Sequence, residues 1–159
     1  MSWREALARM VIGDRRVMVR EALPELQQAH AGLVQRAEQL RRHAQLGPNQ
    51  LSCIELARLA DEEEAEAQRV AQAVVALGGA ASASPAQTPA AGSLNHWGRL
   101  VQDLEGHRAA AKRLREDAFH FAETLPEAAA LFEQLCHAED RHALRLRDLI
   151  ARTDPHALN

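Results

Sequence analysis

Apolar side chains recur along most of this chain at alternating steps of three and four residues, with polar residues between them. That periodicity is typical of helices that bury one face. Glycine and proline interrupt it at Gly47-Pro48, at Gly78-Gly79 and at Pro126. The pattern therefore predicts four long helices: one ending before Gly47, and three over about 52–77, 93–124 and 126–152.

The N-terminal part carries its own helix signals. A short helix is expected over residues 3–11, with Ser2 as its cap and Gly13 as its stop. Pro24 is expected in the first turn of the first long helix, or at a kink within it. We therefore expect an N-terminal helical extension (1–23), a four-helix bundle (24–152) and a C-terminal tail (153–159).

The lengths of the connections predict the topology. The first and third connections between the long helices hold only a few residues, so each pair of helices is expected to form an antiparallel hairpin. The low-complexity connection over 78–93 has about sixteen residues, which at up to ~3.3 Å each reach ~50 Å. The preceding helix, at 1.5 Å per residue, is only ~40 Å long. Two hairpins joined by one long crossover are therefore expected, with an up-down bundle and a loose loop as the alternative.

Composition and charge narrow the class. A chain of 159 residues is most simply one domain, and its net charge of −3 gives no signature of nucleic-acid or membrane binding. Its apolar runs are shorter than the ~20 residues of a membrane span, and no signal peptide is apparent, so a cytoplasmic location is expected. Cys53 and Cys136 form no C-x-x-C pair and are expected to stay reduced and apart.

Ionisable side chains interrupt each expected apolar face near its middle. His30 precedes Glu63 by 33 residues, and His107 precedes Glu139 by 32, so the two halves of the chain repeat the arrangement. If both hairpins share one geometry, all the interrupting side chains lie in one layer of the core. The layer is then expected to ligate two metal ions through six residues: His30, Glu63, Glu66, His107, Glu139 and His142.

An ion-pair network is the alternative for this layer. Three carboxylates and three imidazoles can neutralise one another, whereas an unpaired buried charge costs roughly 3–5 kcal/mol. Two divalent ions neutralise the carboxylates more completely, and mixed nitrogen and oxygen ligands suit iron, manganese or zinc. Gly32 and Gly106, near two of the histidines, are expected to leave room for a further group or for close helix packing. Glu62 and Glu64 are expected to lie on solvated faces, and His43, which lies off the apolar face, is not expected to be a ligand.

Glu139-Asp140-Arg141-His142 resembles the E-x-x-H motif of the ferritin-like superfamily, which includes bacterioferritins and rubrerythrins. The resemblance covers residues 24–152 and implies an all-α, ferritin-like four-helix bundle. It also implies two bound metal ions, with iron as the first expectation and manganese or zinc as alternatives.

The resemblance departs from the family pattern at three positions. His30 and His107 stand where the family has glutamate, and Glu66 stands where it has histidine. Carried over by position, Glu63 and Glu139 would bridge the two ions. The remaining ligands would then divide into His30 with Glu66 on one ion and His107 with His142 on the other.

The resemblance implies redox chemistry with dioxygen or peroxide, including ferroxidation. Non-catalytic metal storage, buffering or sensing is a second hypothesis, and a metal-free interaction bundle is a third. The oligomeric state is left open, with a homodimer as one alternative.

Overall fold

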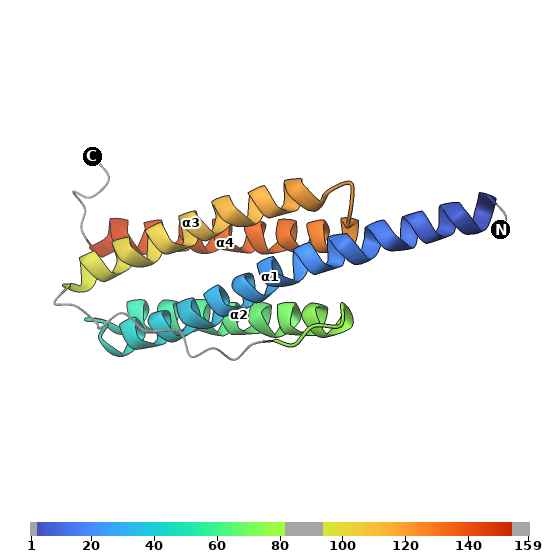
Figure 1. The fold of residues 1–159 in the computed structure, drawn as a ribbon. Coiled ribbons are helices and arrows are strands. Elements are labelled where there is room, and N and C mark those ends of the chain that lie inside the picture. Colours follow the sequence, from blue (N-terminus) through green and yellow to red (C-terminus); the bar gives the residue numbers. More distant parts are fainter. Residues whose placement is uncertain (1–2, 82–93, 154–159) are drawn as a thin grey trace.

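The computed structural model describes residues 3–81 and 94–153, which form four long helices (Figure 1). Strands are absent from these two ranges. The prediction of an all-α bundle is therefore confirmed. The helices are α1 (Trp3–Gln45), α2 (Gln50–Ala76), α3 (His96–Phe121) and α4 (Pro126–Thr153).

The helices are arranged as two antiparallel hairpins, α1 with α2 and α3 with α4 (Figure 1). The α3 helix begins at the end of the bundle where α1 finishes: Arg99 Nη2 donates a hydrogen bond to the carbonyl oxygen of Leu46 at 3.0 Å. Helices α2 and α3 therefore run in the same direction, and the chain between them joins opposite ends of the bundle. This confirms the crossover topology. Residues 82–93 of the expected 78–93 crossover lie outside the described residues.

Specific side chains and glycines set the helix ends. Asn49 and Asn95 cap α2 and α3, each accepting a hydrogen bond from a backbone N–H in the first turn, at 2.9 and 2.7 Å. At the end of α2, Gly78 has φ of 85°. The Gly79 N–H donates back to the carbonyl oxygen of Val74 at 2.9 Å, so the helix closes in a Schellman motif.

The expected break at Gly13 is wrong, because α1 is a single helix of 43 residues. Pro24 also lies within it, twenty-one residues after its start at Trp3. One glycine in a helix costs about 1 kcal/mol of stability relative to alanine, which is too little to end the helix. At Gly78 the backbone turns left-handed and α2 ends, whereas at Gly13 it stays helical.

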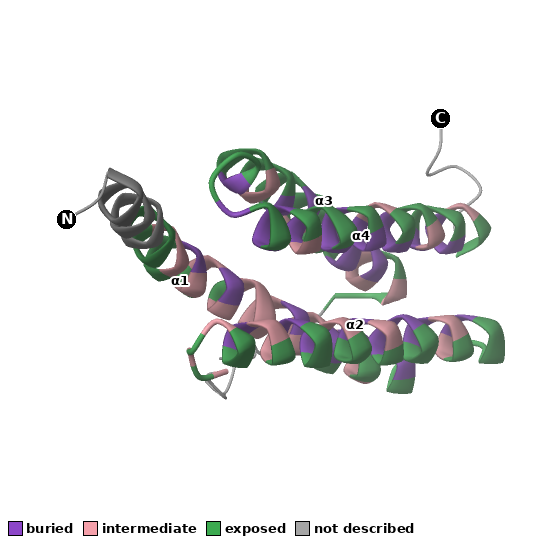
Figure 2. Ribbon diagram, turned by 90° about the vertical axis from the view of Figure 1, so that its right-hand side faces the viewer, coloured by how far each residue is buried: buried purple, intermediate pink, exposed green. Residues whose placement is uncertain are grey.

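The buried faces of the helices turn toward one another (Figure 2) and form two apolar clusters. The first is centred on Leu33, Val70 and Phe132, and the second on Leu40, Leu59 and Leu146. On every helix the residues between the two clusters include charged or imidazole side chains. A polar layer therefore crosses the middle of the core.

The two cysteines are free, as the sequence predicted. Cys136 is buried, and its thiol donates to the carbonyl oxygen of Ala111 at 3.3 Å. Among the described residues, no helix combines the length and the apolar character needed to cross a membrane.

Candidate metal centre

The centre of the polar layer holds four of the six sequence-predicted residues. Glu63 comes from α2, His107 from α3, and Glu139 and His142 from α4. The i, i+3 spacing on α4 places both of its side chains on the inner face. All four are at most 2% exposed, so the surrounding apolar clusters keep bulk water away from them.

The four residues lie close enough to share one metal ion, because one ligand atom from each falls within 4.8 Å of the others. His107 Nδ1 lies 2.6 Å from a Glu139 oxygen, and His142 Nδ1 lies 2.8 Å from a Glu63 oxygen. His107 Nδ1 is also 3.7 Å from Glu63, and the two imidazole rings meet edge to face with centroids 5.4 Å apart. Two carboxylates and two imidazoles therefore face a common point.

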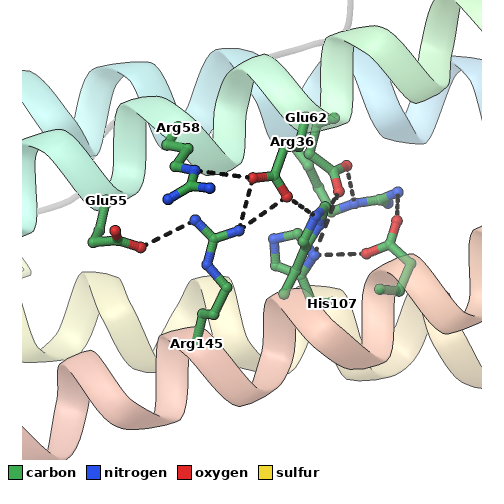
Figure 3. Close-up of polar contacts among 9 residues, drawn as sticks. Arg36, Glu55, Arg58, Glu62, His107 and Arg145 are labelled. Carbon is green, nitrogen blue, oxygen red and sulfur yellow. Dashed lines mark hydrogen bonds and ion pairs between the residues drawn. The ribbon is translucent and has the colours of Figure 1, made fainter.

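Arg36 of α1 joins this group, although the sequence did not single it out. Its Nε donates to Glu63 Oε2 at 3.0 Å, and its Nη2 donates to Glu139 Oε1 at 2.5 Å. The guanidinium group thus bridges the two buried carboxylates (Figure 3). It supplies a positive charge at the place where the sequence predicted metal ions.

The direction of helical side chains explains how Arg36 reaches the layer. Side chains on a helix lean toward its N-terminus, and arginine is long. The guanidinium group lies one turn back, against Gly32, where a Cβ atom would be only 3.1 Å from Nη1 of Arg36. Gly32 therefore leaves room for a further group, as expected, and that group is Arg36.

A second set of ion pairs connects the layer to the surface between α2 and α4 (Figure 3). The Nε2 atom of His142 lies 3.1 Å from Glu62, whose carboxylate accepts from Arg145 at 2.8 Å. Arg145 also donates to Glu55 at 3.0 Å. Glu62 keeps 40% of its side chain exposed, so it lies at the surface as expected, but it also contacts the layer through His142. Glu64, which is half exposed and pairs with Arg41, also lies at the surface.

Burial and charge act on the pKa values of the layer in opposite directions. Burial alone would raise the pKa of Glu63, but Arg36, His142 and His107 outweigh it and lower that pKa. Burial alone would lower the pKa of His142, but the hydrogen bond to Glu63 and nearby carboxylates outweigh it and raise that pKa. Both shifts favour an ionised carboxylate beside a protonated imidazole.

The other two predicted ligands, His30 and Glu66, do not join the four-residue group. His30 is half-buried, and its Nδ1 atom has no hydrogen-bond partner. Glu66 lies 3.3 Å from Arg69 in an ion pair within α2. The matched 33- and 32-residue separations therefore do not bring His30 and Glu66 into the group that His107 joins.

The missed arginine had a signal in the sequence. The buried face of α1 includes Leu33, Ala37 and Leu40, and the steps from Leu33 to Arg36 and from Arg36 to Leu40 are also three and four residues. Periodicity alone could not decide between Arg36 and Ala37. Only the length and direction of the arginine side chain distinguish them.

His43 lies outside the four-residue group, as expected, but it is buried. It is 5% exposed, and its Nδ1 atom lies 2.7 Å from the buried carboxylate of Asp103. Gln39 donates to the other oxygen of Asp103 at 2.6 Å. This contact lies between α1 and α3, next to the second apolar cluster, and is separate from the four-residue group.

The donor set fits a transition metal ion. Two imidazole nitrogens and two carboxylate oxygens form a mixed ligand set of the kind that iron, manganese and zinc accept. His107 also has a buried Nε2 atom without a hydrogen-bond partner, which is unusual for a group so far from water. Arg36 competes with an ion, since it already contacts one oxygen of each carboxylate.

The crossover topology and the mid-bundle polar layer define a ferritin-like four-helix bundle. Two solved structures share this fold. One is Dps from Thermosynechococcus elongatus, 19% identical, with a TM-score of 0.77 over 89% of this chain and 98% of that chain. The other is the dodecameric thioferritin, a bacterioferritin-related protein, from Bacteroides fragilis, 20% identical, with a TM-score of 0.75 over 89% and 92%. No protein-family model and no curated protein sequence matches this chain.

Proposed function

We propose that this chain binds a redox-active transition metal, iron in the first place, in the middle of a ferritin-like bundle. The proposed ligands are Glu63, His107, Glu139 and His142. The single observation that carries the proposal is that three helices bring these four buried side chains within 4.8 Å of one another. Similarity of fold to a thioferritin and to Dps supports it.

Charge balance favours one ion at this group. One divalent cation neutralises the carboxylates of Glu63 and Glu139. A second ion, as the sequence predicted, would have to use His30 and Glu66, which lie outside the group. The stoichiometry of binding distinguishes a one-metal from a two-metal centre.

A bound iron ion would supply one-electron exchange with dioxygen or peroxide. The residues of this chain contribute burial, ligand atoms and proton release. Both ring nitrogens of His142 face carboxylate oxygens, which only accept hydrogen bonds, so the protonated imidazole satisfies both contacts. A histidine ligand must be neutral, so metal binding is expected to release that proton.

Metal analysis of purified protein tests the proposal. Iron or manganese should be present after purification without added metal, and added Fe(II) should bind in anaerobic titrations. Glu139→Gln keeps the size of the side chain but removes a charged ligand, so it should lose most of the bound metal. Glu133→Gln, an exposed carboxylate on the same helix, is the matched control and should bind as the wild type does. Equal metal content in Glu139→Gln and wild type would exclude this site.

A metal-free bundle is the second candidate function. The observation that favours it is that Arg36 already satisfies both buried carboxylates. The buried ion pairs of the layer would then determine which helices pair and in which register. Under this alternative the wild-type protein contains no metal and binds none when Fe(II), Mn(II) or Zn(II) is added.

A further inference from the structure

We propose that Arg36 is a displaceable internal cation that closes the metal site, and that it withdraws into a cavity between α1 and α3 when a metal ion binds. This inference rests on the proposed function and adds a regulatory residue to it. Its basis is the charge balance of the layer and the free space beside the arginine.

Every carboxylate oxygen in the centre of the layer already has a partner. Arg36 takes one oxygen of Glu63 and one of Glu139, while His142 and His107 take the others. An incoming ion therefore competes with existing contacts. It does not enter a vacant set of ligands.

The positive charge of Arg36 cannot be removed by loss of a proton, because the guanidinium group of arginine stays charged at any ordinary pH. Surplus positive charge in a buried, low-dielectric layer costs several kcal/mol. A divalent ion can therefore share this layer with Arg36 only at a large cost, and the arginine has to move out.

The space for that movement lies beside Arg36. A cavity of about 150 Å³ between α1 and α3 is lined by Gly32, Leu33, Arg36, Ala110 and Leu114, among others. A buried water occupies roughly 10–15 Å³ by the same measure, so this volume accommodates the four heavy atoms of a guanidinium group. Gly32 and Arg36 both line this cavity, and Gly32 places no side chain beside the guanidinium group.

The cavity also offers negative charge to a withdrawn guanidinium group. Glu25 and Asp117 lie in its wall, together with Arg113, which pairs with Glu25 at 2.9 Å. Burial and the neighbouring Glu25 raise the pKa of Asp117. A guanidinium group that left Glu63 and Glu139 for this cavity would move toward the carboxylates of Glu25 and Asp117.

A fixed structural ion pair and a displaceable cation give opposite results when Arg36 is replaced. We would measure Co(II) binding by calorimetry and visible absorption, and thermal stability in the presence of a chelator. Arg36→Gln should lower metal-free stability, because two buried carboxylates lose their cation. It should also bind Co(II) roughly tenfold more tightly or better, because no ion pair has to be broken first.

The cavity is tested separately by filling it from α3. Ala110→Leu narrows the cavity without touching the contact between Gly32 and Arg36, so it should weaken Co(II) binding in the wild-type background. In the Arg36→Gln background the same change should have no effect. Ala109→Leu, exposed on the neighbouring position of α3, is the matched control and should change neither affinity.

Each outcome decides the question. A folded Arg36→Gln protein that binds Co(II) no more tightly than the wild type overturns the role of Arg36 while leaving metal binding intact. Equal effects of Ala110→Leu in both backgrounds overturn the role of the cavity. Absence of Co(II) binding in both wild type and Arg36→Gln refutes the proposed function and, with it, this inference. If Arg36→Gln does not fold, Arg36→Lys replaces it in the test. Lysine keeps the positive charge, but its ammonium group cannot bridge two carboxylates as a guanidinium group does, so this variant should bind Co(II) more tightly than the wild type. Binding no tighter than the wild type would count against the proposal.

Discussion

At the scale of single residues, Glu63 and His142 make the stability of the metal-free protein depend on pH in both directions. Burial opposes ionisation of both groups, but their partners lower the pKa of Glu63 below 4.5 and raise that of His142 above 6.5. The Glu63 contribution is present above its unfolded pKa and is lost as pH falls through the folded one. The His142 contribution is present below its unfolded pKa and is lost as pH rises through the folded one.

Metal-free protein should therefore be most stable between about pH 4.5 and 6.5. Urea unfolding in the presence of a chelator, repeated across pH, measures this directly. His142→Gln should flatten the alkaline side of the profile and leave the acid side in place. A wild-type stability that increases steadily from pH 6.5 to 8 would contradict the assigned pairing of His142.

The identity of residue 107 should influence the reaction with oxidants. The chain has His107 where the pattern that it resembles has glutamate, so an iron ion bound as proposed would meet one negative charge fewer, and its ferric state would be stabilised less. Fe(II) in the wild-type protein should therefore react faster with hydrogen peroxide than with dioxygen, as followed by stopped-flow absorbance. His107→Glu restores the carboxylate and should speed oxidation by dioxygen. Faster dioxygen oxidation in the wild type than in His107→Glu would refute the charge argument.

The sequence predicted part of the site, and the limits are physical. Glu63, His107, Glu139 and His142 interrupt apolar faces, and such interruptions are visible to a periodicity argument. Arg36 lies at the edge of the buried face of α1 and reaches the layer through its long side chain. Its position in the sequence therefore did not predict these contacts. The cation that pairs with Glu63 and Glu139 could therefore be identified only from the three-dimensional structure.

At the scale of helices, two glycines should respond to alanine with opposite signs. Gly78 ends α2 with φ of 85°, where a side chain costs roughly 1–2 kcal/mol. Gly106 lies within α3, is exposed, and a Cβ atom there would meet no other atom within 4 Å. Gly78→Ala should thus destabilise the protein by about 1–2 kcal/mol, and Gly106→Ala should stabilise it by up to about 1 kcal/mol. Chemical denaturation measures both, and a gain in stability from Gly78→Ala would contradict the assigned helix end.

Glycine and proline predicted most helix ends but not the length of α1. Gly78 and Pro126 mark real boundaries, whereas Gly13 and Pro24 lie inside one continuous helix. The difference is the backbone conformation that the surrounding structure imposes, which residue type alone does not reveal. The sequence therefore predicted the number and order of the bundle helices better than it predicted the start of the first.

At the scale of the whole molecule, the crossover topology followed from chain length and reach. A connection long enough to span the bundle permits parallel α2 and α3, and the structure places them so. This arrangement brings the middle of all four helices to one level, between the two apolar clusters. Metal binding as proposed would be coupled to folding, because the four candidate ligands come from α2, α3 and α4 and meet only in the folded bundle.

That coupling predicts a metal-dependent melting temperature. An ion present at about 100 times its dissociation constant adds ~2.7 kcal/mol to the free energy of unfolding. For a chain of this size, that corresponds to a rise of roughly 5–10 °C. Calorimetry with and without Co(II) should show the rise, and a chelator should reverse it. Glu139→Gln should melt at the same temperature with and without Co(II), whereas Glu133→Gln should show the full rise. A full rise in Glu139→Gln would place the bound ion elsewhere on the protein.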